Sequence, residues 1–267
     1  VPPGVINIVH GRGAGIGEEI VKHRDVPVIS FTGGTETGKK INTLCANNFK
    51  KVSLELGGKN PTIIFSDCDF DKAVETSVRS AFLNQGQICL CGSRIFVEKN
   101  LYSRFKSAFV KEVKKLVVGN PSSKNTFLGA VVSKDHMEKI LYYIDVAKKE
   151  GGRVLCGGKQ VFLKGKLKGG YYISPTVISG LDYLCRLNQE EVFGPVVSII
   201  PFENEKDVIK MANSTKYGLS ASLFTENLSK AHRVSAKINS GVIWVNTWLL
   251  RDLRIPFGGM KDSGVGR

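Results

Sequence analysis

Short apolar runs alternate with segments of helical periodicity along this chain. Runs that end in glycine or a polar residue are typical of buried strands, and the first part of the chain has three of them, at 4–11, 26–33 and 61–66. Further runs predict strands after Arg94 and at 195–202, 219–225 and 241–246. The sequence therefore predicts strands distributed over its whole length.

Between these runs, apolar residues recur every three or four positions, as on one face of a helix. This pattern predicts a helix over 69–83, with Asp69 as its N-cap, and a helix over 133–150 that stops at Gly151. Other helices are expected at 17–23, from about Thr35, at 101–116, near 205–214 and from about 228 to 239. Alternating strands and helices indicate an α/β fold with a mostly parallel, helix-covered sheet. The glycines and Asn-Pro of 57–61 are the best candidate for a domain boundary.

The composition, 42% hydrophobic and 23% charged, is ordinary for a globular protein, and no apolar run approaches the length of a membrane span. The formal charge of +14 raises the question of a polyanionic partner. The lysines come as scattered pairs, and the densest basic run, 164–168, lies in a glycine-rich loop without interleaved aromatics. We therefore expect a solvated basic surface and neither nucleic acid nor a membrane as partner, with a basic polyanion-binding module as the weaker alternative.

The six cysteines form no CxxC pair and have no histidines at metal-ligand spacing. This usage predicts free thiols in a reducing compartment, and hence a cytoplasmic protein. Cys89 and Cys91 supply only two ligands, which do not complete a tetrahedral site, so we expect no metal.

Two glycine-rich segments are candidates for cofactor contacts. The glycines of HGRGAGIG (10–17) fit no register of the G-x-G-x-x-G fingerprint, so we interpret this segment as a flexible turn. In FTGGTETGKK (31–40) a predicted strand ends, Gly33 and Gly34 allow close backbone approach, and a helix begins. Free N–H groups at such a helix start suit a pyrophosphate, although a plain strand-to-helix turn has the same pattern.

An acid and a thiol are the candidates for chemistry. Glu55, between two leucines, either faces solvent from a strand or projects into a cavity as a general base. Cys89 is the thiol nearest the turn that follows Gly86, whereas we interpret Cys91 as structural. Strand alternation would point both sulfurs the same way, and a helix would point them nearly opposite ways.

Six segments, in this order, resemble the aldehyde dehydrogenase superfamily over essentially the whole chain. They are FTGGTETG (31–38), LELGGK (54–59), Phe82 with GQIC (86–89) and Arg94, EEVFGP (190–195), YGL (217–219), and PFGG with SGVGR (256–259, 263–267). The resemblance implies that residues 1–57 are the end of a Rossmann-type dinucleotide-binding domain and that residues 58–267 form an α/β catalytic domain.

The resemblance also implies a reaction. Cys89 would attack an aldehyde, a hydride would pass to NAD, and Glu55 would activate the water that hydrolyses the thioester, with the Cys89 N–H in the oxyanion hole. Glu191 and Phe193 match the positions that hold the nicotinamide ribose and pack beside its ring. Gly33 and Gly34 would face the pyrophosphate.

Within the family, WVNTWLLRDLRIPFGG (244–259) is similar to the dehydrogenases that oxidise 2-aminomuconate and 2-hydroxymuconate semialdehydes. An arginine at the position of Arg251 would bind the substrate carboxylate there, and a surface salt bridge with Asp252 or a neighbour is the structural alternative. We therefore expect a carboxylated semialdehyde as substrate.

Some features of the family pattern are missing from the chain. Gly34 stands where a serine is often found, and the family's N-terminal portion and its C-terminal oligomerisation strand have no counterpart here. We expect a homo-oligomer in the full-length form. Two alternatives remain: a dehydrogenase for another aldehyde, with a structural Arg251, and a non-catalytic remnant of the fold.

Overall fold

The computed structural model describes residues 1–267, and its centre is a seven-stranded sheet. The strand order is β12-β11-β3-β4-β9-β8-β5, and every neighbouring pair is parallel except the antiparallel pair β5 and β8. The strands are β3 (Asn60–Ile64), β4 (Gly92–Glu98), β5 (Arg153–Cys156), β8 (Thr176–Ser179), β9 (Val196–Phe202), β11 (Ser220–Phe224) and β12 (Val242–Val245). The predicted mostly parallel, helix-covered sheet is confirmed.

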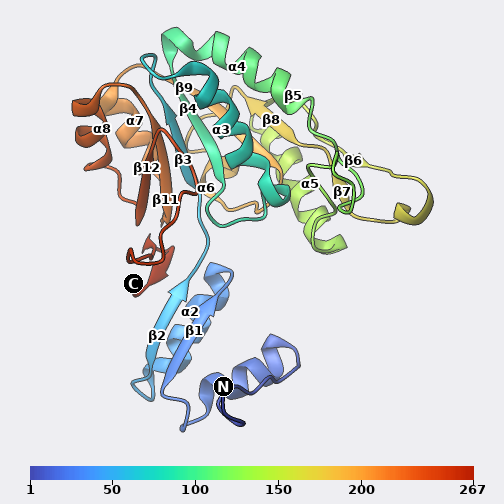
Figure 1. Ribbon diagram of the computed structural model, residues 1–267, viewed down its shortest axis with the longest axis vertical. Coiled ribbons are helices and arrows are strands. Elements are labelled where there is room, and N and C mark those ends of the chain that lie inside the picture. Colours follow the sequence, from blue (N-terminus) through green and yellow to red (C-terminus); the bar gives the residue numbers. More distant parts are fainter.

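Helices cover both faces of this sheet (Figure 1). Successive residues of a strand point to opposite faces, so Ile64 packs with α3 (Phe70–Phe82) and α4 (Lys99–Val113), while Ile63 packs with α7 (Glu205–Ala212) and α8 (Leu228–Ser235). Both isoleucines are fully buried. Burial on both faces explains why the central strands are continuous apolar runs rather than alternating ones. A third cluster gathers under α5 (Lys134–Lys149) and α6 (Arg186–Gln189).

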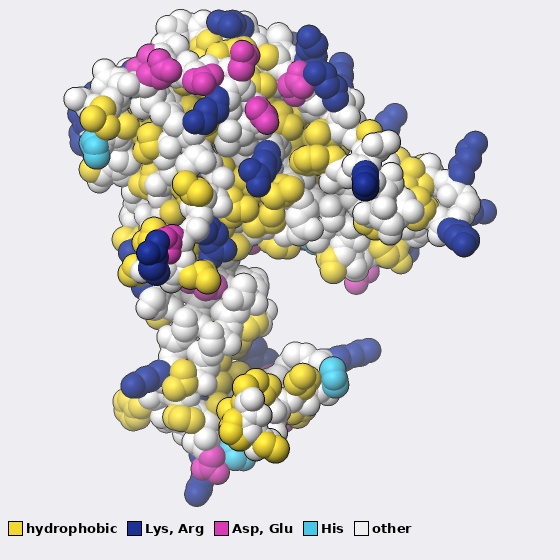
Figure 2. Space-filling view, in the orientation of Figure 1, with side chains coloured by type: hydrophobic (Ala, Val, Ile, Leu, Met, Phe, Trp, Pro, Cys, Tyr) yellow, Lys and Arg dark blue, Asp and Glu magenta, His cyan; other side chains and the backbone are white.

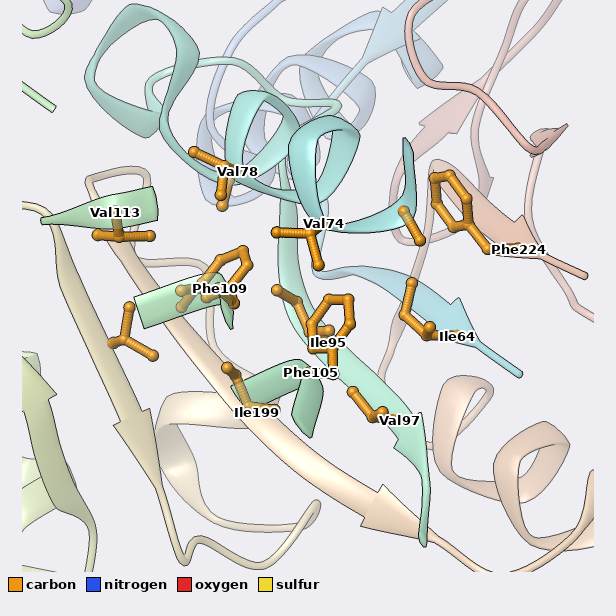
Figure 3. Packing of buried hydrophobic residues seen from close by; sticks show 14 of the residues in the cluster. Ile64, Val74, Val78, Ile95, Val97, Phe105, Phe109, Val113, Ile199 and Phe224 are labelled. Carbon is orange, nitrogen blue, oxygen red and sulfur yellow. The ribbon is translucent and has the colours of Figure 1, made fainter. Parts of the chain in front are cut away.

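Figure 3 shows the first of these clusters, with aromatic side chains of α4 turned toward the strands. Phe105 and Phe109 stack with ring centroids 5.9 Å apart, and Phe82, the last residue of α3, lies 6.2 Å from Phe109. All three rings are fully buried. This packing fixes the C-terminal end of α3, which leads directly into the segment that carries Cys89.

A smaller three-stranded sheet lies beyond one end of the large sheet, and the β2–β3 connection joins the two sheets (Figure 1). Its order is β1 (Val28–Thr32), β2 (Lys51–Glu55) and β14 (Gly264–Val265), with β14 antiparallel to β2. Helices α1 (Glu18–Lys22) and α2 (Thr35–Ala46) pack on it through a separate apolar cluster. Two short pairs complete the fold: β6 (Gln160–Val161) with β7 (Tyr172–Ile173), and β10 (Tyr217–Gly218) with β13 (Met260–Lys261).

The structure corrects the sequence predictions at two places. Residues 4–11 form no strand, and their apolar side chains are exposed, because the small sheet offers no strand that pairs with them. Gly13–Gly17, predicted to be a flexible turn, forms a π-helical turn that continues into α1. The strand predicted at 61–66 is present as β3, and its Pro61, which lacks a backbone donor, lies at an irregularity in the pairing with β4.

The surface agrees with the prediction of dispersed charge. On the face in Figure 2, most lysines and arginines are separated by other side chains, apart from a group at the upper right beside α4 and those at the tip of the arm that carries β6 and β7. The exposed Lys164, Lys166 and Lys168 lie in that arm. None of the helices has the length and apolar character needed to cross a bilayer.

Arg94, in β4, is 1% exposed and has no carboxylate partner. Its guanidinium donates to the carbonyls of Lys59 (2.9 Å), Met211 (3.0 Å) and Ala212 (2.8 Å). It therefore ties the connection after β2 to the end of α7.

Arg94→Met should lower the free energy of unfolding by about 2–3 kcal/mol, because buried carbonyls lose their donors while the apolar volume is kept. Urea unfolding followed by circular dichroism measures this change. Arg153→Met, at an exposed position of β5, is the matched control and should be nearly neutral. Equal effects of the two substitutions would show that the Arg94 bonds contribute little to stability.

Candidate functional site

The thiol segment begins with an unusual backbone turn after α3. Leu83–Gly86 forms a short 3₁₀ turn in which Asn84 and Gln85 have positive φ angles of 51° and 58°, followed by Gly86 at 67°. A side chain at Gly86 would place a Cβ atom 2.3 Å from the carbonyl oxygen of Gly194. Glycine is therefore required here, and this contact brings the thiol segment against the segment that contains Glu191 and Phe193.

Asn60 holds the two cysteines' backbone in place. Its side-chain amide donates to the carbonyl of Cys89 at 2.7 Å and to that of Cys91 at 2.9 Å. Its side-chain oxygen accepts the backbone N–H of Ser220 at 3.1 Å. Because Asn60 is 3% exposed, this clamp fixes the thiol segment to strands β3 and β11. The local sequence around Asn60 gives no indication of this role.

The two thiols have different surroundings. Cys91 N–H donates to the Ile88 carbonyl, so the segment turns between the two cysteines and is neither extended nor a continuing helix. Cys91 is 7% exposed, and burial raises its pKa to about 12. Cys89 is half-buried, and its pKa is raised by burial first and then by the carboxylates of Glu191 and Glu55. Cys89 is thus the accessible thiol, and it needs a proton acceptor to react at neutral pH.

Gly57 and Gly58 have no side chains, and this allows Glu191 and the backbone of Cys89 to lie close to them. A Cβ at Gly57 would lie 2.2 Å from a carboxylate oxygen of Glu191, and a Cβ at Gly58 would lie 2.7 Å from the Cys89 carbonyl oxygen. The N–H of Gly58 donates to the Glu191 carboxylate at 3.0 Å. Burial raises the pKa of Glu191, and this N–H and the lysines 139 and 59 oppose the rise. The glycines therefore bring the Glu191 carboxylate and the thiol segment together.

Glu55 ends β2, beside the last residue of β1. Its backbone carbonyl accepts the N–H of Gly33 at 3.0 Å, which ties the predicted base to the predicted phosphate-binding turn. The side chain is partly buried, burial raises its pKa, and the charge of Arg251 opposes the rise. A carboxyl with a raised pKa in partly dry surroundings is suited to act as a base near neutral pH.

A pocket of about 480 Å³ lies between the two sheets. It brings together five residues predicted from the sequence: Gly33, Gly34, Cys89, Glu191 and Phe193. Glu55 and Arg251 do not line it, although their charges act on the pKa of Cys89. The other lining residues, which the sequence analysis did not identify, are Thr32, Leu56, Gly57, Gln87, Ile88, His136 and Lys139.

Arg251 lies on an exposed segment near the thiol. The Trp244 indole N–H donates to the Leu250 carbonyl at 2.8 Å, and the Arg251 guanidinium lies 4.7 Å from the centre of the Phe257 ring. Asp252 pairs with Arg254 and not with Arg251, so the structure has no Arg251–Asp252 salt bridge. The guanidinium of Arg251 therefore has no carboxylate within salt-bridge distance.

A second cavity, of about 720 Å³, lies between α1, α2 and β1. It borders α2, the helix that begins directly after Gly34. Its walls are largely aliphatic and include Val21, Val28, Ile29, Ile41 and Leu44. Such a cavity fits a flat apolar group better than a charged one.

A comparison with models of protein families shows to which family these site residues belong. The model of the "Aldehyde dehydrogenase family" matches residues 1–267. The chain belongs to the aldehyde dehydrogenase family.

Several curated members of the aldehyde dehydrogenase family are similar to the whole chain. The 2-aminomuconic semialdehyde dehydrogenase of Mus musculus is 49% identical over 100% of this chain and 55% of its own length. The 2-aminomuconic 6-semialdehyde dehydrogenase of a Pseudomonas species is 46% identical with the same coverage. The 4-trimethylaminobutyraldehyde dehydrogenase of Oryzias latipes is 44% identical. The chain spans about half the length of the curated relatives it matches.

Solved structures of the aldehyde dehydrogenase family have the same fold. A double mutant of betaine aldehyde dehydrogenase from Staphylococcus aureus, in complex with NAD+, superposes with a TM-score of 0.96 at 43% identity. The match covers 100% of this chain and 53% of that one. The α/β fold expected from the sequence is therefore confirmed as that of an aldehyde dehydrogenase.

Proposed function

We propose that this chain carries the catalytic half of an NAD-dependent aldehyde dehydrogenase that oxidises an aldehyde to its carboxylic acid. The observation that supports this most strongly is the common pocket of Cys89, Gly33 and Glu191, three residues from distant parts of the sequence. Membership of the aldehyde dehydrogenase family and the likeness to a relative crystallised with NAD+ agree with it.

The residues present fit NAD. Gln87 lines the pocket, and its side-chain oxygen is buried without a hydrogen-bond partner, as an acceptor for a carboxamide would be. The hydroxyl-bearing Thr35, at the first position of α2, is likewise buried beside Gly34. We propose that Gly33, Gly34 and the first turn of α2 hold the pyrophosphate, that Glu191 holds the ribose, and that the aliphatic cavity takes the adenine. NAD+, when bound, accepts a hydride from the substrate carbon.

Cys89 is the proposed nucleophile. Its sulfur adds to the aldehyde carbon, and the oxygen gains negative charge that the Cys89 N–H stabilises, giving a thiohemiacetal. Loss of hydride from that carbon leaves a thioester on Cys89. Burial and the Glu191 and Glu55 carboxylates raise the pKa of Cys89, so its proton passes to solvent water as the bond to carbon forms.

Glu55 is the proposed base for the second half of the reaction. Its carboxylate takes a proton from the water that attacks the thioester, and the thiol leaves as the acid forms. Arg251 stabilises the charged form of Glu55, and burial favours the neutral form, so the base remains able to bind a proton.

The substrate that we propose is a semialdehyde with a carboxylate group. Arg251 carries a guanidinium without a carboxylate partner, and its charge acts on both Cys89 and Glu55, so we propose that it binds the carboxylate at the far end of a short substrate. The names of the mouse and Pseudomonas relatives also describe carboxylated semialdehydes.

Arg251→Ala in the full-length gene product should raise KM for 2-aminomuconate semialdehyde about 10–100-fold, because a charge-assisted hydrogen bond to the carboxylate is lost. KM for a neutral aldehyde of similar size should change little. Reduction of NAD+, followed by absorbance, measures both values. Arg254→Ala is the matched control, since Arg254 is exposed and already paired with Asp252.

Equal changes for charged and neutral aldehydes would favour a structural Arg251 and a different substrate. No reduction of NAD+ with any aldehyde, in a folded full-length gene product, would favour a non-catalytic protein.

A further inference from the structure

Phe193 has a strained backbone next to the proposed reaction site. Its φ angle is +59°, in the left-handed region that bulky side chains rarely adopt. The Phe193 side chain lines the same pocket as Cys89. A strained residue at such a place persists only when its surroundings hold it.

The peptide that follows Phe193 is enclosed on two sides. Gly194 lies so close to Ile140 of α5 that a Cβ on Gly194 would be 2.5 Å from that side chain. On the other side, the Gly194 carbonyl faces Gly86 in the turn that leads to Cys89. Any relaxation of the Phe193 backbone would therefore disturb the thiol segment.

His136 supplies the polar contact that fixes this peptide. Its Nε2 lies 2.6 Å from the Phe193 carbonyl oxygen, and because a carbonyl only accepts, Nε2 carries the hydrogen and donates. The two rings also meet edge to face, with centroids 6.1 Å apart. His136 is itself fixed in the first turn of α5, where its backbone N–H donates to the Ser133 hydroxyl at 3.2 Å.

We propose that His136 is a positioning residue that holds the Phe193 peptide in its left-handed conformation and thereby sets the place of the Phe193 ring beside Cys89. The expected effect of His136 on the reaction rests on the proposed function, whereas its expected effect on the Phe193 backbone does not. The Phe193 ring then forms a fixed surface of the pocket, against which the nicotinamide ring of a bound cofactor would pack. Without the bond, the backbone relaxes toward a negative φ angle and this surface moves.

Three variants of the full-length gene product test the proposal. His136→Leu removes the donor and keeps the volume, and His136→Gln keeps an N–H donor of similar reach. His232→Leu, on the exposed face of α8, is the control. Single-turnover formation of reduced NAD should slow about 10–100-fold in His136→Leu, since a small misplacement of reacting groups has effects of that size. It should be nearly unchanged in His136→Gln and His232→Leu.

Hydrogen–deuterium exchange of the peptide 190–196 gives a readout that needs no activity. Exchange should increase in His136→Leu and stay at the wild-type level in His136→Gln. Unchanged exchange in His136→Leu, or an equal increase in both variants, would overturn the proposal. A wild-type protein without dehydrogenase activity would contradict the proposed function alone, and the exchange experiment would still decide the role of His136.

Discussion

Cys89→Ala should abolish aldehyde oxidation by the full-length gene product, with a loss in kcat of about 10³-fold or more. The reason is that no other accessible thiol lies in the pocket with Gly33 and Glu191. Reduction of NAD+ with a saturating aldehyde measures the loss. Binding of NAD+ should be retained, because the cofactor contacts that we propose come from other residues.

Cys91→Ala is the matched control, two positions away. Cys91 is buried with its pKa raised to about 12, so we expect it to contribute packing and no chemistry. Its removal should cost about 1 kcal/mol of stability through a small cavity and leave most of the activity. Equal loss of activity from both substitutions would contradict the assignment of the nucleophile.

Glu55→Gln should slow hydrolysis of the thioester about 10²–10⁴-fold, because the attacking water loses its base. The first hydride transfer does not need that step. We therefore expect a burst of about one reduced NAD per active site, followed by very slow turnover. Stopped-flow absorbance measures the burst. Glu226→Gln, on an exposed loop after β11, should behave as the wild type does.

The same assignment predicts a pH dependence. The base form of Glu55 exists only above its pKa, which burial raises above the usual value for glutamate. Steady-state turnover limited by hydrolysis should therefore fall as the pH drops through this raised pKa, and the Gln variant should lack this limb. If the wild type and the Glu55→Gln variant gave a burst of the same size, and the variant had no slow phase, the base would be another group.

Much of this architecture follows from hydrophobic pattern alone. The buried strands were predictable because β3, β9 and β11 lie between two layers of helices and are therefore continuous apolar runs. Asp69 was predictable as an N-cap because its side chain accepts the Lys72 N–H, a contact within one turn. Residues 4–11 have the same apolar pattern but no pairing strand, and an apolar run cannot specify a partner by itself.

The site was predictable only in part, for a physical reason. The cysteine and glutamate segments form recognisable sequence motifs, so Cys89, Glu55 and Glu191 could be proposed as site residues, and the structure brings Cys89 and Glu191 into one pocket. Asn60 contacts the backbone carbonyl of Cys89, 29 positions away along the chain. His136 contacts that of Phe193, 57 positions away. Such contacts depend on the tertiary fold and have no signature in the local sequence. The reason for the double glycine was likewise visible only in space, where Gly57 and Gly58 face Glu191 and Cys89.

One measurement addresses the covalent chemistry directly. The Glu55→Gln protein is mixed with aldehyde and NAD+, quenched with acid during the slow phase, and digested for mass spectrometry of its peptides. The mass of the acyl group should appear on the sulfur of residue 89 and on no other site. An unmodified Cys89 peptide, or an acyl group on Cys91 or elsewhere, would contradict the mechanism proposed for this protein.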